Sequence, residues 1–489
     1  MLTLLITVQA TAAEKVLRVA LPDSLGTLDP GYWANQSEAA VMSAVLPRLV
    51  NYLPGKKWVY ENELAKSIEV IDPTTIAFAL KPGFQWSNGY GDITAEDVKF
   101  SFERFGRLNA PNKGDWAPLK EVIVKDKYNG VIKLSKPFAP LFTSTLPYLS
   151  GMIICKKAAL ELGDKKMGVE LKAYGGNYRI KEWLPKQRLV VVANEGWAGA
   201  KPVYGEIEFV QVSDDKAAEN AFLSGDIDFG HVPITAVASL EKKSVGKGSV
   251  EVYATDAYLW LGMNMENPVL KDERIRKALK LAVDVPTVLD AGYMGAAEVA
   301  TGMISANMIG HVDTKPKYDP DQARRLLKEA GATNLKLTLD VQARPERITM
   351  AQVIQANLAD VGINVVINQH DAGSFWSLAK EKQDELQLTL KNFVQPPDPS
   401  WGTQWFITEQ AGSWNWEWFK NAKFDQMHDA ALSELNDSKR TEIYKSMMHL
   451  MNESDAFIWL TYLPQAVVYS KKIKPAITPD SNCRWDLFE

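Results

Sequence analysis

Residues 75–105 read TIAFALKPGFQWSNGYGDITAEDVKFSFERF and contain a strand, a turn and a helix in close succession. The alternation over residues 75–80 predicts a strand that ends before Pro82. A helix is expected to start at Thr94, because Asp97 follows three residues later and completes a capping box. One face of this helix carries apolar side chains at helical spacing, namely Val98, Phe102 and Phe105. The stretch therefore joins a strand to an amphipathic helix.

Outward from this stretch, strands and helices alternate along the chain. Strands are expected at residues 16–21, 131–134, 335–339 and 363–367, and helices at residues 213–225, 272–284, 319–331 and 348–361. From residue 319 the order is helix, strand, helix, strand. That order is typical of a mostly parallel sheet flanked by helices, so we predict an α/β protein.

The composition excludes several classes of protein. Hydrophobic residues make up 46 % of the 489 residues and charged residues 24 %, as in a globular protein. This length allows about three domains and a large core. The net charge is −5 and lysines and arginines form no long run, so we expect no nucleic-acid partner. Two cysteines without a CxxC motif exclude a zinc ribbon, an iron–sulfur cluster and a disulfide scaffold.

Signatures of catalysis are weak. The sequence has no GxSxG, HExxH or GxxxxGK[ST] motif and no GxGxxG after a strand. Its histidines show neither HxH nor HxxxH spacing, which indicates surface or core residues rather than metal ligands. Asp226 and Asp228 suggest paired carboxylates, but they fit a turn-to-strand junction better. We therefore expect no enzymatic activity, no cofactor and no metal.

The N-terminus indicates export. Residues 1–8 are apolar and the small residues 10–13 (ATAA) precede Glu14, so residues 1–13 are expected to be a signal peptide whose start lies upstream. The alternative is a buried first strand. No cysteine lies near the cut, and no apolar run reaches the length of a membrane span. We therefore expect a soluble protein in the periplasm of a Gram-negative bacterium.

Tryptophans gather in the last quarter of the chain. Five of the 15 fall within 18 residues, namely Trp401, Trp405, Trp414, Trp416 and Trp418. The preceding residues 395–400 (QPPDPS) cannot form a helix interior. A rigid loop beside several indoles predicts a preformed wall for a ligand. The alternative is a core cluster, to which we expect about half of these indoles to belong.

Four segments in order resemble the extracytoplasmic solute-binding proteins of the dipeptide, oligopeptide, nickel and opine group, known as family 5, which supply ABC importers. They are residues 78–104 quoted above, GNYRI (176–180) followed by NEGW (194–197), GDIDF (225–229), and NMENPVLKDERIRKALKLAVD (264–284). The resemblance spans nearly the whole mature chain.

The resemblance implies a two-lobed α/β periplasmic-binding-protein clamshell with an extra inserted subdomain, of the cluster C type. By analogy, lobe I comprises residues 14–50, 177–258 and 466–489, the inserted subdomain comprises 51–176, and lobe II comprises 259–465. Ligand is expected to sit between the lobes. Their closure excludes water and so strengthens hydrogen bonds and ion pairs in the cleft.

Two positions bear on the class of ligand. In the peptide binders of this group, an aspartate ahead of an Asp-Pro turn pairs with the α-ammonium of the ligand. Here Gln395 stands at that position, with Asp398-Pro399 as the turn, and an amide supplies no counter-charge. The segment 341–345 (VQARP) resembles the one whose arginine holds the ligand carboxylate in dipeptide binders. Arg344 is therefore expected to grip a carboxylate, the alternative being a surface salt bridge.

The ligand-binding residues expected from the resemblance and from the indoles are Tyr32, Trp33, Trp260, Arg344, Gln395, Asp398, Trp401 and Trp416. Trp33 and Trp260 are expected to face the indoles of the wall across the cleft. No catalytic residue is expected among them.

The resemblance thus implies a periplasmic binding protein that captures a small polar solute bearing a carboxylate. Candidate ligands are an opine-like sugar–amino-acid conjugate, a modified amino acid and a short peptide. The protein is expected to be a monomer that delivers its ligand to an ABC permease complex in the inner membrane. The alternatives are a secreted hydrolase acting on such a substrate and a metal-chelate carrier of the nickel type.

Export also bears on the cysteines. The oxidising compartment allows a disulfide between Cys155 and Cys483, and the resemblance places both cysteines on the lobe I side. Sequence alone does not give their separation.

The leader gives the first prediction. The mature chain should begin at Ala13 or Glu14, because the small residues before Glu14 fit the site that signal peptidase cuts. Mass spectrometry of the protein from its native host checks this. Retention of Met1 on the secreted chain would contradict it.

Overall fold

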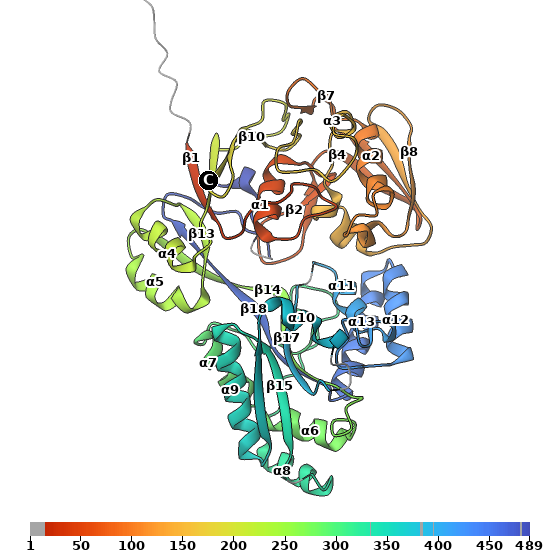
Figure 1. The fold of residues 1–489 in the computed structure, drawn as a ribbon. Coiled ribbons are helices and arrows are strands. Elements are labelled where there is room, and N and C mark those ends of the chain that lie inside the picture. Colours follow the sequence, from red (N-terminus) through yellow and green to blue (C-terminus); the bar gives the residue numbers. More distant parts are fainter. Residues whose placement is uncertain (1–14, 333, 382–384, 395, 480–481) are drawn as a thin grey trace, which may run out of the picture.

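The computed structural model describes residues 15–332, 334–381, 385–394, 396–479 and 482–489. A ten-stranded sheet organises it, in the order β10-β11-β12-β1-β13-β18-β14-β17-β15-β16 (Figure 1). The strands are β1 (Val16–Leu21), β10 (Tyr178–Leu184), β11 (Arg188–Ala193), β12 (Glu206–Gln211), β13 (Phe229–Val232), β14 (Gly248–Met263), β15 (Lys336–Gln342), β16 (Asn364–His370), β17 (Leu388–Phe393) and β18 (Phe457–Ser470). Sequence-distant strands thus lie side by side.

Two long central strands carry the sheet from one half of the molecule to the other. β14 and β18 are antiparallel, and their pairing runs from Gly248–Ser470 at one end to Gly262–Phe457 at the other. The register shifts between Ala254 and Tyr258, near the middle. In Figure 1 the two strands cross from the α4–α5 region to the lower half. We call the half with β1 and β10–β13 lobe I, and the half with β15–β17 lobe II.

Each lobe has three adjacent parallel strands. They are β12-β1-β13 in lobe I and β17-β15-β16 in lobe II. The order helix, strand, helix, strand after residue 319 therefore predicted parallel pairing correctly within lobe II. The sheet as a whole is mixed, because β14 and β18 run in opposite directions and pair antiparallel with β17 and β13.

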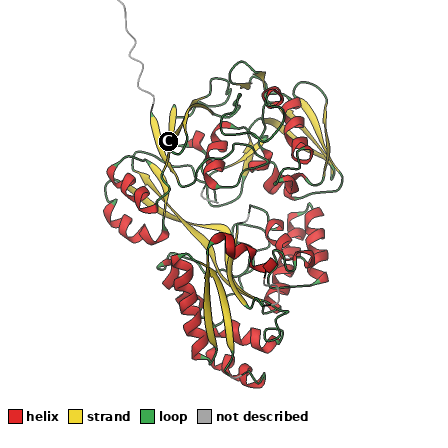
Figure 2. Ribbon diagram, viewed as in Figure 1, coloured by secondary structure: helices red, strands yellow, loops and turns green. Residues whose placement is uncertain are grey.

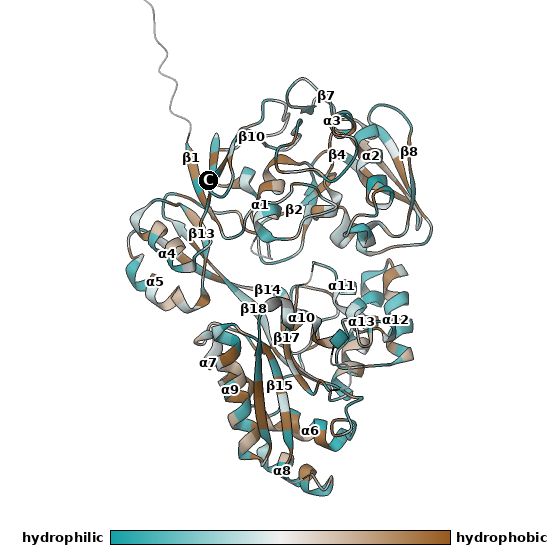
Figure 3. Cartoon of the chain, in the orientation of Figure 1, coloured by the Kyte–Doolittle hydropathy of each residue, from teal (hydrophilic) through white to brown (hydrophobic). Residues whose placement is uncertain are grey.

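Helices cover both lobes (Figure 2). Lobe I has α1 (Gln36–Val45), α4 (Asp215–Ser224) and α5 (Val237–Lys243), and lobe II has α6 (Glu273–Ala282), α7 (Val285–Tyr293), α8 (Pro320–Glu329), α9 (Pro345–Asp360), α10 (Ala372–Glu381), α11 (Ser400–Thr403), α12 (Ala422–Ser433) and α13 (Asp437–Glu453). Figure 3 shows much brown on the lobe II strands and mixed brown and teal on its helices. The helices thus bury one apolar face on the sheet.

A smaller antiparallel sheet, β4-β5-β9-β8, forms the core of an inserted subdomain. Its strands are β4 (Ala65–Asp72), β5 (Thr75–Leu80), β8 (Leu119–Val124) and β9 (Asn129–Leu134), and helix α2 (Ala95–Arg107) packs on it. Shorter elements complete this part, namely β2 (Val50–Tyr52), β3 (Tyr60–Asn62), β6 (Gln85–Trp86), β7 (Gly91–Asp92) and α3 (Lys156–Glu161).

The strand and helix expected in residues 75–105 are confirmed as β5 and α2. Thr94 is the N-cap of α2, and its backbone N–H donates to Asp97 Oδ2 at 2.9 Å. Phe102 lies fully buried on the inner face and stacks on Trp116 at 4.1 Å between ring centroids. Local capping and apolar periodicity therefore place this helix as the sequence indicates.

A buried ion pair fastens the subdomain to lobe I. Arg104 of α2 donates from Nη1 and Nη2 to the two carboxylate oxygens of Asp29, at 2.9 and 2.8 Å. Asp29 follows β1 and is fully buried. Such a bidentate pair fixes orientation as well as distance, so α2 is held rigidly against the start of the chain.

Cys155 and Cys483 do not form the disulfide that the sequence allowed. Within the described part of the chain both are buried thiols in different places. Cys155 packs with the inserted subdomain, whereas Cys483 packs in the lobe I core beside Trp485. Two separate cores hold the side chains where neither can bridge to the other.

The expected signal peptide, residues 1–13, lies outside the described residues. Among the described helices, none is both long enough and apolar enough to cross a membrane.

The second prediction concerns these thiols. Titration of the denatured protein without reductant should give two thiols per chain, because the fold keeps Cys155 and Cys483 in separate cores. Burial raises the pKa of the Cys155 thiol to about 11, so in the native protein it should react slowly with alkylating reagents. Finding no thiol in the denatured chain would contradict the structure.

Candidate functional site

The parallel strands of both lobes have their carboxyl ends at the cleft between the lobes. β1 and β13 end toward lobe II, and β15 and β17 end toward lobe I, as their registers with β14 and β18 show. In open α/β sheets, ligands bind outside the carboxyl ends of the strands. The segments after these four strands are therefore the place to look for a binding site.

One cavity lies beside the two long strands, and we call it the hinge cavity. Its volume is about 830 Å³. It is lined by the segments that follow β1, β13 and β15, by the end of α7, and by β18, through residues that include Pro22, Gln36, His231, Pro233, Tyr293, Arg344, Arg347 and Gln465. The hinge cavity therefore collects residues from both lobes, as a closing ligand site requires.

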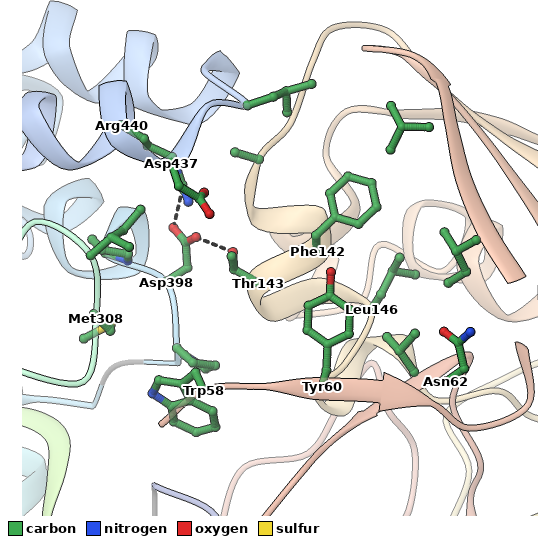
Figure 4. A pocket seen from close by; sticks show the side chains of 18 of the residues that line it. Trp58, Tyr60, Asn62, Phe142, Thr143, Leu146, Met308, Asp398, Asp437 and Arg440 are labelled. Carbon is green, nitrogen blue, oxygen red and sulfur yellow. Dashed lines mark hydrogen bonds and ion pairs between the residues drawn. The ribbon is translucent and has the colours of Figure 1, made fainter. Parts of the chain in front are cut away.

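A second cavity, of about 750 Å³, lies between the inserted subdomain and lobe II, and we call it the subdomain cavity. Figure 4 shows Tyr60 and Phe142 on the subdomain side, facing Asp398, Asp437 and Arg440 of lobe II. Much of its wall is apolar, from Val50, Ile68, Val70, Leu146 and Met308. This cavity can take a group with a large apolar surface.

Asp398 lies in the wall of the subdomain cavity, but its charge is already balanced. Arg440 Nη2 donates to it at 2.8 Å, and Thr143 donates to it as well (Figure 4). The hydroxyl of Ser400 is a further donor. Burial by itself would raise the pKa of Asp398, but Arg440 and these hydroxyls lower it below its usual value. Asp398 is thus an ionised structural anchor of the loop, engaged before any ligand arrives.

Arg344 and Arg347 stand at the start of α9 and both line the hinge cavity. Arg344 is the N-cap residue of the helix and is exposed. Arg347, three residues on, is only 4 % exposed. Its Nη2 donates to Asn392 Oδ1 of β17 at 3.2 Å. The expectation from sequence named Arg344 alone, and the structure brings a second guanidinium to the same cavity.

The aromatic residues expected at the ligand are more buried than a ligand wall requires. Trp260 is fully buried, and its Nε1 donates to Glu417 Oε1 at 2.8 Å. Trp416 is 2 % exposed and packs on Phe375. The structure places both in the core of lobe II, because α10 and the 404–419 loop cover that face of the sheet.

The remaining expected residues are spread over the cleft. Tyr32 lies beneath Lys166, and Trp33 packs edge-on against Tyr148, both in lobe I and both half-buried. Trp401 is half-buried in α11. Gln395 lies outside the described residues. The hinge cavity therefore contains Arg344 but none of these side chains.

A cluster of half-buried and exposed indoles does exist, although with other members. Trp405 and Trp414 lie 5.4 Å apart between ring centroids, and Trp376 lies 6.0 Å from Trp414. Trp414 is 41 % exposed. Sequence proximity indicated Trp405 and Trp414. Trp376, from α10, joins them only through the fold.

Behind the indoles lies a buried ion pair that sequence reasoning missed. Lys391 Nζ lies 3.4 Å from Glu417 Oε2, and both side chains are fully buried. The ammonium also sits 4.4 Å from the ring centroid of Trp416 and 5.1 Å from that of Trp260. Burial lowers the pKa of Lys391 to about 8, although Glu417 opposes the shift. The pair fixes the loop that carries Trp414.

No cluster of metal ligands accompanies these features. Among the described residues, no three histidine, cysteine, aspartate or glutamate side chains are grouped so that they could hold a metal ion.

Comparison with known proteins places the chain among binding proteins. The sequence model described as bacterial extracellular solute-binding proteins, family 5 middle, matches residues 59–414. A Brucella ovis relative named as an ABC transporter peptide-binding protein is 27 % identical over 412 residues, covering 80 % of this chain and 76 % of its own. The glutathione-binding protein GsiB of Escherichia coli O1:K1 / APEC is 26 % identical, covering 95 % of this chain and 92 % of its own.

Solved structures agree on the fold. HbpA2 from Haemophilus parasuis superposes with a TM-score of 0.86 at 20 % sequence identity, covering 97 % of this chain and 99 % of its own. At that identity the likeness concerns the arrangement of lobes and subdomain, not the ligand.

The third prediction concerns the buried lysine. Lys391 binds its proton with a pKa of about 8 when folded, against an ordinary value of 10.5. Above about pH 8 the unfolded chain therefore holds the extra proton, and stability rises with pH. Relative to the double variant Lys391→Met/Glu417→Gln, the free energy of unfolding should rise by about 2 kcal/mol between about pH 8 and about pH 10.

Denaturant titrations of both proteins at several pH values measure this difference. A difference that stays constant, or falls, as pH rises would show that burial does not depress the pKa of Lys391.

Proposed function

Because the chain belongs to family 5 of the bacterial extracellular solute-binding proteins, we propose that it captures a solute for an ABC importer and hands it to the permease in the inner membrane. We further propose that it works in the periplasm as a monomer. Closure of the two lobes about β14 and β18 retains the solute. Binding and release need no chemical step, so we assign the protein no catalytic activity.

The proposed ligand is a small polar solute that bears a carboxylate, such as an opine-like conjugate, a modified amino acid or a short peptide. The single observation that carries this proposal is the position of Arg344. It lies in the hinge cavity, opposite Pro22 and Gln36 of lobe I. When the lobes close, the exposed guanidinium becomes enclosed and water leaves, so its ion pair with a ligand carboxylate becomes stronger.

A free peptide amino terminus fits this cleft less well than a carboxylate does. Asp398 follows the aligned position in the sequence, and Arg440, Ser400 and Thr143 already engage it. Gln395 supplies no charge. A buried ammonium without a partner costs several kcal/mol, so a plain dipeptide should bind poorly.

The glutathione-binding relative is consistent with this class of ligand. Glutathione carries two carboxylates and one ammonium group and is therefore a net anion, whereas a plain dipeptide with neutral side chains has no net charge. A second candidate function, transport of a metal chelate, receives less support because the described residues hold no cluster of metal ligands, although a chelate can bring its own. The alternative of a secreted hydrolase receives no support, because the sequence contains no recognised nucleophile motif.

The fourth prediction tests the ligand class by calorimetry. A panel of unmodified dipeptides, glutathione, opine-like conjugates and neutral sugars is titrated into the wild type, Arg344→Ala and Gln395→Asp. The wild type should bind carboxylate-bearing members other than plain dipeptides. Arg344→Ala should weaken that binding at least tenfold, because truncating one partner of an enclosed charge pair costs about 2–5 kcal/mol. Gln395→Asp should improve binding of plain dipeptides.

Arg324→Ala is the matched control, because Arg324 is exposed on α8 and pairs with Asp321 away from both cavities. It should bind as the wild type does. Tight binding of plain dipeptides by the wild type, or unchanged binding in Arg344→Ala, would overturn the assignment.

A further inference from the structure

We propose that Arg347, at the amino end of α9, forms with Arg344 a dedicated site for a carboxylate group of the ligand. Arg347 supplies the buried, preorganised part of the site, and Arg344 supplies the part that closes over it. This inference rests on the proposed function and deepens it, since it gives the solute a net negative end in the hinge cavity.

The first step is that the buried charge of Arg347 meets an acid only at long range. Its Nη1 is buried and has no hydrogen-bond partner. Its Nη2 meets only the neutral amide of Asn392. Glu346 Oε1 forms a long ion pair with its Nε at 3.9 Å, beyond hydrogen-bond distance.

The second step is that other buried arginines of this chain have an acid at close range or several carbonyl oxygens as acceptors. Arg104 meets Asp29 at 2.8 Å, and Arg440 meets Asp398 at 2.8 Å. Arg276 donates to three backbone carbonyl oxygens, at 2.9 to 3.0 Å. Arg440 Nη1 is buried without a hydrogen-bond partner, as Arg347 Nη1 is, but Arg440 has an acid at 2.8 Å whereas the acid beside Arg347 lies at 3.9 Å. Arg347 also lines the hinge cavity.

The third step concerns the field around Arg347. It sits in the first turn of α9, a helix of 16 residues whose amino end lines the hinge cavity. The amino end of a helix favours an anion, through its dipole and its unpaired N–H groups. Arg344 adds a second positive charge close enough to lower the pKa of Arg347, a shift that comes mainly from burial. A bound anion would offset the repulsion between Arg344 and Arg347 and would compensate Arg347 for the water that burial removes.

The fourth step is the charge of the cavity itself. Among the described residues that line it, the charged side chains are Arg344, Arg347 and Glu346. His231 also lines it, but burial lowers the pKa of His231 to about 4, so this ring is neutral at pH 7. The cavity therefore carries a net positive charge. A ligand end with more carboxylates than amino groups matches it best.

The experiment uses succinate as the probe, because succinate presents carboxylates without an amino group. Melting temperatures are measured with succinate, inorganic phosphate or sodium chloride at equal ionic strength. Succinate should raise the melting temperature of the wild type by about 2 °C or more over sodium chloride, since a ligand that binds only the folded state stabilises it. In the same titration, Arg347→Met should need at least ten times more succinate for the same rise in melting temperature.

Asn392→Asp provides a second variant that keeps the arginine. The introduced carboxylate would lie where Asn392 Oδ1 now accepts from Arg347, 3.2 Å from Nη2. It would form an ion pair with the guanidinium and so balance its charge without a ligand. It should abolish the succinate effect even where Arg347→Met fails to fold. Arg324→Met, on the exposed face of α8, is the matched control and should respond as the wild type does.

Three results would overturn the proposal. They are a wild type that melts equally in succinate and in sodium chloride, an Asn392→Asp variant that responds as strongly as the wild type, and a larger rise with phosphate than with succinate. The outcome also separates this inference from the proposed function. Capture of a carboxylate-bearing solute with Arg347→Met unaffected would refute only the role of Arg347, whereas a succinate effect without any such capture would refute only the solute class.

Discussion

The antiparallel pairing of β14 with β18 is the constraint on which the rest of the structure depends. These strands are paired from Gly248 to Gly262, with register shifts between Ala254 and Tyr258 and between Leu259 and Trp260, and each also pairs with a strand of a different lobe. Both parallel triplets of strands therefore end at the same cleft. The register shifts lie in the part of the two strands that joins the lobes.

The cleft differs in charge from one end to the other. At the subdomain end, acid and base neutralise each other in the Asp398–Arg440 pair, and the surrounding wall is largely apolar. At the hinge end, Arg344 and Arg347 outnumber Glu346. A solute that spans the cleft would therefore place its anionic group beside α9 and its bulk toward the subdomain. Trp58, which lines the subdomain cavity, donates to Asp256 of β14 at 2.7 Å and so ties the subdomain to this long strand.

Sequence predicted the features that depend on neighbouring residues. The capping box of Thr94 and Asp97, the apolar face of α2 and the strand–helix order of lobe II are local patterns, and each is confirmed. The burial of Trp260 and Trp416 depends on which helices cover lobe II, so composition alone suggested a ligand wall where the structure has a core. Arg347 was missed although a signal existed, since it shares the apolar stripe of α9 with Met350, Ile354 and Leu358. A charge on such a stripe predicts either a buried partner or a ligand.

The most direct test of the account is a crystal structure of the protein purified from its native periplasm without denaturation, so that captured solute stays bound. The account predicts density in the hinge cavity, with a carboxylate within about 3 Å of the guanidinium groups of both Arg344 and Arg347. A solute held only in the subdomain cavity, or one that turns an ammonium or a neutral group toward Arg347, would contradict it.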